Sequence, residues 1–396
     1  MFIHCASLEE LDVSSFNTSS ATTFEEMFYR CRSLRSLDLS CFDTSAATTF
    51  ALMFYNCASL AALDVSTFDI TSATDLSRAF QGCKSLTELD LSRASTAKVQ
   101  TFHGVFTGCS GLERIDLSLL DTSSARDLSY LFADCSKLEA VNCAGIKTSS
   151  VTDFNHMFSN CSSLTSLDLS SFDTAAATNL SYLFFGCSSL RTLDLSSFKT
   201  GNVTTFEHMF HGCSSLTSLN LSSFDTSNVE TMVNLSTGCT KLAEVTLGKS
   251  FAWVGSQCFL PQPNATFIPG ADGLWHAASN GVAYRPSDVP DKKADTYRAV
   301  APGGEDDAAE DGADVVNGAN PTGAAESANG SGAAENAGNA GCAGSGSVAD
   351  TASGASTPNG ENHAIAAEGM MALGREDYMP ALAIANPSAA VPSVVA

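Results

Sequence analysis

Ten cysteines of this chain lie on one arithmetic series, each 26 residues after the one before. They are Cys5, Cys31, Cys57, Cys83, Cys109, Cys135, Cys161, Cys187, Cys213 and Cys239. Self-similarity at a fixed period of 20–50 residues indicates one supersecondary unit stacked on copies of itself. Disulfide frameworks and metal sites have uneven spacings, so these cysteines mark the same point in successive turns of a solenoid.

The residues after each of these cysteines predict a short strand. The third is Leu in all ten copies, the sixth is Leu, Ile or Val, and the eighth is apolar, as in Leu164, Leu167 and Leu169. The last two of these positions alternate with period two, which places them on one face of a strand. One strand per turn, all in the same direction, predicts a parallel sheet.

The second half of each repeat predicts a helix of about two turns. Its apolar positions have the spacing i, i+3, i+6 and i+7, as in Val203, Phe206, Met209 and Phe210. That spacing forms one stripe of a helix, and Ser or Thr ahead of it can cap the first turn. An Asn or Gly before many of the cysteines is expected to have positive φ, as at a helix end.

The cysteines of the series are expected to be buried thiols. Equivalent residues on stacked turns point in parallel, so their Cβ atoms lie about 5 Å apart, whereas a disulfide requires about 3.8 Å. A free Cys is also a good small buried hydrophobe. The predicted fold is therefore an α/β solenoid with a parallel sheet on one side, short helices on the other and a continuous core between them.

Residues 301–396 differ in composition from the repeats. They are rich in Ala, Gly, Ser and Asn, and they carry thirteen acidic side chains against one basic side chain, Arg375. Such a segment buries too little apolar area to offset its ordering entropy, which predicts a disordered tail. The formal net charge of −23 argues against nucleic acid and anionic membranes as partners.

The chain begins inside a repeat. Met1-Phe2-Ile3-His4-Cys5 aligns with Met53-Phe54-Tyr55-Asn56-Cys57, so Met1 occupies a core column. We therefore interpret Met1 as an internal Met or as the start of a truncated gene, which would also explain why no signal peptide precedes the repeats. We find no apolar stretch of 18 residues, and so predict no membrane insertion for this chain.

Two segments carry a resemblance to a known family. Residues 161–174 read C-S-S-L-T-S-L-D-L-S-S-F-D-T, and residues 203–213 read V-T-T-F-E-H-M-F-H-G-C. This repeat, over residues 1–250, resembles the BspA-type leucine-rich repeats of bacterial surface proteins, the DUF285 group. The resemblance implies an extracellular or cell-surface protein that presents a solenoid to host surfaces or neighbouring cells without enzymatic activity. Residues 251–300 are similar to the small β module that often closes such arrays.

The candidate binding face consists of the residues that vary beside the core alternation, together with a row of aspartates on the same face. The predicted residues are Glu10, Ser36, Glu88, Arg114, Ser166, Thr192, Ser218, Asp12, Asp38, Asp64, Asp90, Asp116, Asp168 and Asp194. The alternative is a merely solvated face. Stacked carboxylates could bind Ca²⁺, but one Asp per turn is a poor cage for an ion that takes six or more oxygens. Aspartates bonded to neighbouring Ser or Thr are the better interpretation.

The sequence predicts no enzyme, no cofactor and no resident metal. His208, His211 and Cys213 resemble a metal-binding trio, but that Cys is a core residue in the other copies. The leading hypothesis is a non-catalytic cell-surface protein that mediates adhesion or binds a protein or cell-surface ligand. The alternative is a passive spacer that displays a module missing from this chain.

One region of the predicted core is weak. Ala79 stands where other turns have Met, and Ala94 replaces the Phe of six other copies. Losing a large side chain from a packed core costs several kcal/mol unless the structure collapses around the gap. We therefore predict a local change in curvature or a small cavity lined by Ala79, Ala94, Phe68 and Leu120.

Overall fold

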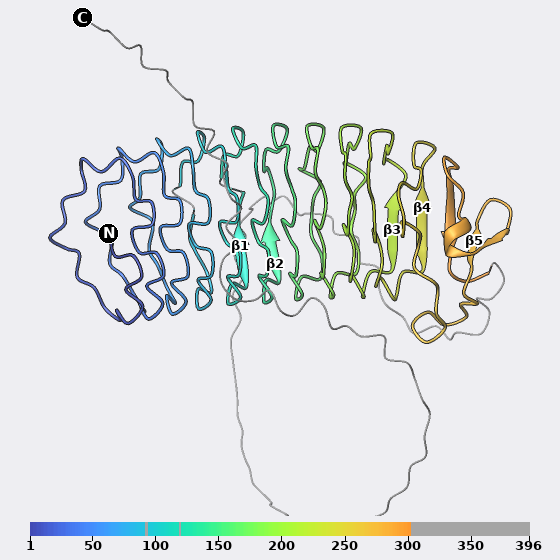
Figure 1. Ribbon diagram of the computed structural model, residues 1–396, viewed down its shortest axis with the longest axis horizontal. Coiled ribbons are helices and arrows are strands. Elements are labelled where there is room, and N and C mark those ends of the chain that lie inside the picture. The colour runs from blue at the N-terminus through green and yellow to red at the C-terminus, as the bar shows by residue number, and fades with distance from the viewer. Residues whose placement is uncertain (92–93, 119, 302–396) are drawn as a thin grey trace, which may run out of the picture. The chain divides into compact units, whose positions relative to one another are not determined.

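A computed structural model describes residues 1–91, 94–118 and 120–301, all within one compact unit formed by residues 1–313. Figure 1 shows successive turns of the chain side by side. Four turns contain a regular strand: β1 (Arg114–Asp116), β2 (Ala140–Asn142), β3 (Ser218–Leu221) and β4 (Glu244–Leu247). The predicted tail, apart from residue 301, lies outside the described residues.

The strands pair with the register that the 26-residue period requires. β1 and β2 are parallel, as are β3 and β4, and each residue lies opposite the residue 26 positions later, such as Leu219 opposite Val245. The predicted parallel pairing is confirmed for these strands. In β3 the alternate residues Leu219 and Leu221 are buried, while Ser218 and Asn220 are exposed.

The predicted helices are wrong. The one helix in the described ranges is a 3₁₀ turn, η1 (Pro286–Asp288), which lies beyond the repeats. The second half of each turn instead forms isolated parallel bridges to its neighbours, for example Asp153 to Asn179. Backbone amides that a helix would satisfy internally donate to the next turn: Phe154 N to Asn179 O (3.1 Å) and His156 N to Ser181 O (3.1 Å).

Two left-handed residues in each turn explain why no helix forms. In the turn before Cys161 they are His156 (φ 56°) and Asn160 (φ 58°), four residues apart, and the positions repeat along the chain. Each starts a tight bend closed by a local bond, such as Ser159 N to His156 O (3.0 Å). Bends four residues apart bury residues at helix-like spacings, so the apolar pattern does not distinguish the two structures. The positive φ predicted before the cysteines is present, although no helix ends there.

Stacked phenylalanines run through the core. One ring from each turn packs on its equivalent with centroids 5.5–6.0 Å apart and planes within 17° of parallel. The column consists of Phe2, Phe28, Phe54, Phe80, Phe106, Phe132, Phe158, Phe184 and Phe210. Because each ring covers its neighbour, burial depends on adjacent turns, and no turn is stable on its own.

The cysteine column is buried and reduced. All thirteen cysteines among the described residues are free, and Cys31 to Cys239 of the series are buried. Each of these thiols donates a hydrogen bond to a Phe carbonyl of the preceding turn at 3.0–3.2 Å, as Cys161 Sγ does to Phe132 O. Burial raises the pKa of Cys57, Cys109 and Cys187 to about 12. Phe132 O also accepts Cys135 N at 3.1 Å, so the thiol is a second donor to a carbonyl that is already paired, and it links that turn to the next.

A column of buried threonines joins the turns on the side opposite the cysteines. Thr174 has no exposed surface; its hydroxyl accepts from Lys199 N at 2.8 Å and donates to Lys199 O at 3.0 Å. The column comprises Thr18, Thr44, Thr96, Thr122, Thr148, Thr174, Thr200 and Thr226, all buried. Ile70 occupies the equivalent place in one turn. The burial of these threonines was not predicted from the sequence.

The C-terminal part of the described chain continues the sheet of the last turn. β5 (Trp275–Ala277), β6 (Ala283–Tyr284) and β7 (Asp295–Arg298) join β3 and β4 in a five-stranded sheet of order β3-β4-β7-β5-β6. β7 pairs antiparallel with β4, so it satisfies the edge that the parallel stack would leave open.

A cavity of about 60 Å³ lies at the predicted weak point of the core. Ala79, Ala94 and Phe68 line it, as predicted, but Leu120 is not among its lining residues. The other walls are Phe50, Met53, Phe54, Val65, Ile70, Leu76, Phe80 and Leu91. The cavity prediction is therefore confirmed apart from Leu120.

Candidate binding face

The candidate binding face lies on the strand side of the turns. All fourteen residues named for it are exposed. A Leu or Ile stands between the exposed residues of each turn. It is half-buried in the first turn, at Leu11, and buried in the later ones, as at Leu37 and Leu193, each 8% exposed. The rows are straight because equivalent residues are paired in register.

Two shallow grooves bring most of these residues together. The first, of about 710 Å³, spans three turns and is lined by Ser36, Leu37, Asp38, Ala62, Leu63, Asp64, Glu88, Leu89 and Asp90. The second, of about 400 Å³, is lined by Ser166, Leu167, Asp168, Thr192, Leu193, Asp194 and Ser218. Glu10, Asp12, Arg114 and Asp116 line neither groove, so the structure divides the predicted face.

The aspartate row closes the turn after each strand. Oδ1 of Asp38, Asp168 and Asp194 each accepts the backbone N–H of the serine two residues later at 2.9 Å. Asn220 makes the same contact with Ser222 N at 3.0 Å. The interpretation that these aspartates bond neighbouring serines is therefore confirmed, and asparagine serves the turn equally well.

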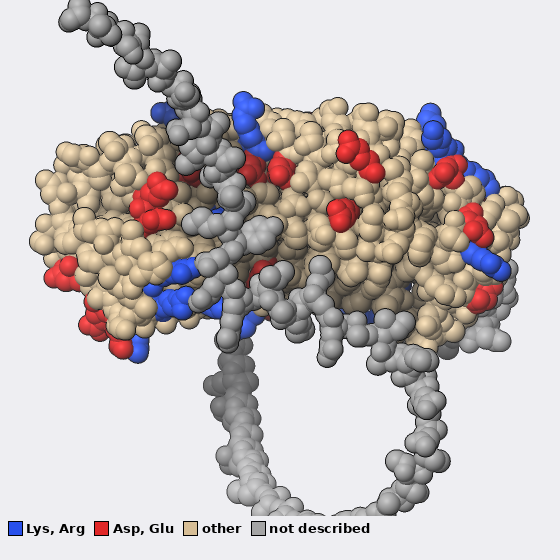
Figure 2. Space-filling view, in the orientation of Figure 1, with Lys and Arg blue, Asp and Glu red and all other residues tan. Residues whose placement is uncertain are grey.

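The aspartates carry negative charge at neutral pH. Hydrogen bonds from the backbone and side chain of Ser40 lower the pKa of Asp38, although Asp64 and Asp12 oppose that shift. Ser170 has the same effect on Asp168. The first groove thus combines four carboxylates with no basic lining residue. On the face that Figure 2 draws, acidic and basic side chains are scattered among uncharged ones.

Two further observations concern possible metal ligands and ion pairs at the face. Within residues 1–91, 94–118 and 120–301, no three His, Cys, Asp or Glu side chains are arranged to hold a metal ion. Arg114 contacts Glu139 at 3.7 Å, but both side chains are more than half exposed, and such pairs contribute little to stability.

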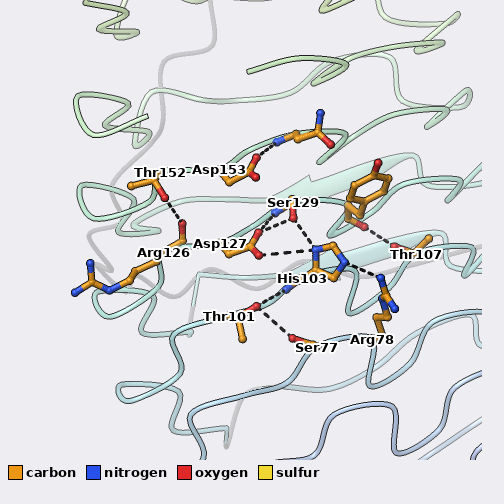
Figure 3. A network of polar contacts seen from close by, with 12 residues as sticks. Ser77, Arg78, Thr101, His103, Thr107, Arg126, Asp127, Ser129, Thr152 and Asp153 are labelled. Carbon is orange, nitrogen blue, oxygen red and sulfur yellow. Dashed lines mark hydrogen bonds and ion pairs between the residues drawn. The ribbon is translucent and has the colours of Figure 1, made fainter. Parts of the chain in front are cut away.

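A polar network on another side of the turns includes a histidine, a serine and an aspartate (Figure 3). His103 Nδ1 lies 2.7 Å from Ser129 Oγ, which donates to Asp127 Oδ1 at 2.5 Å. Arg78 donates to His103 Nε2 at 3.2 Å, so Nε2 is the acceptor and the proton is on Nδ1. Burial, and then Arg78, lower the pKa of His103, while Asp127 opposes them.

This network lacks the geometry of a catalytic triad. In a triad, the serine and the aspartate contact opposite nitrogens of the imidazole. Here Ser129 Oγ and, at 3.8 Å, Asp127 Oδ2 both lie against Nδ1, while Arg78 occupies Nε2. The group therefore bridges turns rather than activating a nucleophile. Its residues were not singled out from the sequence, since no two turns repeat the combination.

A second unpredicted feature is a stack of tyrosines and histidines. Tyr130, His156, Tyr182 and His208 pack ring on ring with centroids 4.5, 4.3 and 4.7 Å apart. Burial, and then His208, lower the pKa of His156 to about 4. Cys213 takes no part, because its thiol donates to Phe184 O at 3.1 Å.

Taken together, the 26-residue period, the leucine columns and the one parallel strand per turn define a leucine-rich repeat protein. The family model described as "Mycoplasma protein of unknown function, DUF285" matches residues 1–88, 58–164 and 126–249. These matches span more than half of the chain, so it belongs to the DUF285 family, and the resemblance to the DUF285 group is confirmed.

Solved structures give two more likenesses. A leucine rich cell surface protein from Faecalibacterium prausnitzii A2-165 is 17% identical, with a TM-score of 0.25, over 56% of this chain and 75% of that one. TLR13, in its complex with ssRNA13, is 16% identical, with a TM-score of 0.21, over 59% of this chain and 43% of that one. No curated protein matches the sequence. In the described part of the chain, no helix has the length and apolar character to span a membrane.

Proposed function

We propose that this chain is a non-catalytic cell-surface protein that binds a protein or cell-surface ligand through the candidate binding face. The observation that carries the proposal is the contrast between a constant buried frame and exposed rows that differ from turn to turn. Leu37, Leu63 and Leu89 form the floor of the first groove, whereas Ser36, Ala62 and Glu88 vary above it. A surface of this kind can change its ligand without changing its fold.

The cell-surface location rests on membership of the DUF285 family, together with the resemblance to BspA-type surface proteins. A non-catalytic role is supported by the surroundings of His103, because Ser129 and Asp127 both lie against the same ring nitrogen, Nδ1. The rival function is a passive spacer, which would need no particular residues on the strand face.

Binding of the labelled full chain to intact epithelial and bacterial cells tests the proposal. Three substitutions, Ser166→Arg, Thr192→Arg and Ser218→Arg, would together fill the second groove with charge and bulk. The matched control places Arg at Thr152, Thr178 and Thr204, which follow one another at the same 26-residue interval on the opposite half of the repeat. We expect the groove variant to lose cell binding and the control to keep it.

The first groove permits a test of charge alone. Asp38→Asn, Asp64→Asn and Asp90→Asn remove three negative charges, and Asn220 shows that asparagine preserves the turn. If a cationic partner uses this groove, the triple variant binds more weakly and loses the salt dependence of binding. Equal cell binding by the wild type, both groove variants and the control would refute the proposal and favour the spacer.

A further inference from the structure

A pocket in the core opens to solvent between the turns of Cys31, Cys57 and Cys83. Its lining residues Leu91 and Ala94 are partly exposed. Their equivalents three turns later, Leu169 and Phe172, are 2% and 3% exposed. The pocket therefore opens to solvent at positions that are buried in the turn of Cys161.

The missing side chains account for the shape of the pocket. In ordinary turns a ring from one turn stacks on a ring from the next: Phe24 on Phe42 at 5.6 Å, and Phe50 on Phe68 at 5.9 Å. One turn further along, this pair is replaced by Leu76 and Ala94, and both residues line the pocket. The void thus stands where a phenyl ring stands in neighbouring turns.

The walls favour an apolar aromatic occupant. Every described lining residue is apolar, and four of them are phenylalanines. A polar ligand would lose its hydrogen bonds to water without replacement, and apolar cavities stay dry and bind small hydrocarbons. Aromatic pairs gain most with centroids about 4.5–7 Å apart, the spacing that the stacked rings of this core already use.

We propose that this pocket is a binding site for a phenyl group. The void, about 60 Å³, is smaller than the roughly 150 Å³ cavity known to hold benzene. The open mouth beside Ala94 and the flexible Met53 side chain accommodate the remainder of the ring. The ring can come from a free aromatic molecule or from a phenylalanine side chain of a partner polypeptide.

Calorimetric titration of the full chain with toluene tests the site. We expect one site per chain in the wild type and at least tenfold weaker binding in Ala94→Phe, whose own ring occupies the void. Ala79→Met, which fills the same void with a residue found in equivalent positions, is a second blocking variant. Phe172→Ala opens an equivalent void elsewhere and is expected to add a second site.

N-acetyl-phenylalaninamide and N-acetyl-alaninamide distinguish the two sources of the ring. Binding of the phenylalanine compound but not of the alanine compound shows that a partner side chain can enter, whereas binding of toluene alone assigns the site to small aromatics. No toluene binding by the wild type near its solubility limit would overturn the proposal. So would equal affinity in the wild type and whichever blocking variants fold.

Discussion

Replacing Thr174 by valine is expected to weaken one interface between adjacent turns. The substitution preserves the shape of a side chain with no exposed surface. It removes the hydroxyl that accepts from Lys199 N at 2.8 Å and donates to Lys199 O at 3.0 Å. Two backbone groups of the next turn therefore lose their partner at once.

The size of the effect follows from those two groups. An unsatisfied backbone group costs about 1–3 kcal/mol, and we take roughly 1.5 kcal/mol for each, because Lys199 is itself an exposed residue. Burying a methyl group in place of the hydroxyl recovers about 0.8 kcal/mol. The net expectation is a loss of about 2 kcal/mol in the free energy of unfolding.

Urea denaturation and amide hydrogen exchange together measure this loss. Because the stability of stacked repeats is a sum of neighbouring interfaces, faster exchange should concentrate in the turns on either side of Thr174. Thr178→Val is the matched control: its hydroxyl is exposed and donates a single bond, to Thr152 O at 3.2 Å, so a loss below about 0.5 kcal/mol is expected. Equal losses in the two variants would refute the assignment of stability to the buried threonine column.

Three further predictions concern other positions. In urea denaturation, Gly186→Ala should lower the free energy of unfolding by about 2 kcal/mol and Gly145→Ala by about 1 kcal/mol. Both glycines have positive φ, but only at Gly186 would the new Cβ collide with Asn160. Equal losses would contradict this. The pKa of His156 is lowered to about 4 from about 6.5 in the unfolded chain, so the unfolded state binds the proton first and stability falls as the pH drops from 6.5 to 4. His156→Tyr should reduce the pH dependence of the unfolding midpoint between pH 6.5 and 4. An unchanged slope of the midpoint against pH would exclude this histidine as a cause. Ala94→Phe should raise the free energy of unfolding by about 1 kcal/mol. Filling 60 Å³ at roughly 24 cal/mol per Å³ contributes about 1.4 kcal/mol. A destabilised variant would show that the void cannot accommodate the ring.

The candidate face could be located from the sequence because it depends on strand alternation. Once Leu167 and Leu169 are assigned to the core, Ser166 and Asp168 must point outward, and all of them do. The two grooves could not be located in this way. They depend on which neighbouring side chains are small, such as Ala62 beside Leu63, and on how the side chains of three turns lie together.

The sequence by itself determined the features that recur, or fail to recur, every 26 residues. The 26-residue register, the parallel strands, the buried free cysteines and the void at Ala94 all follow from comparing one turn with the next. Tertiary structure decided the conformation of the second half of each turn. Apolar residues such as Phe154, Met157 and Phe158 have the same spacing in a helix and in a series of tight bends. The bends form because Phe154 N and His156 N bond carbonyls of the following turn, and those partners exist only once the turns have stacked.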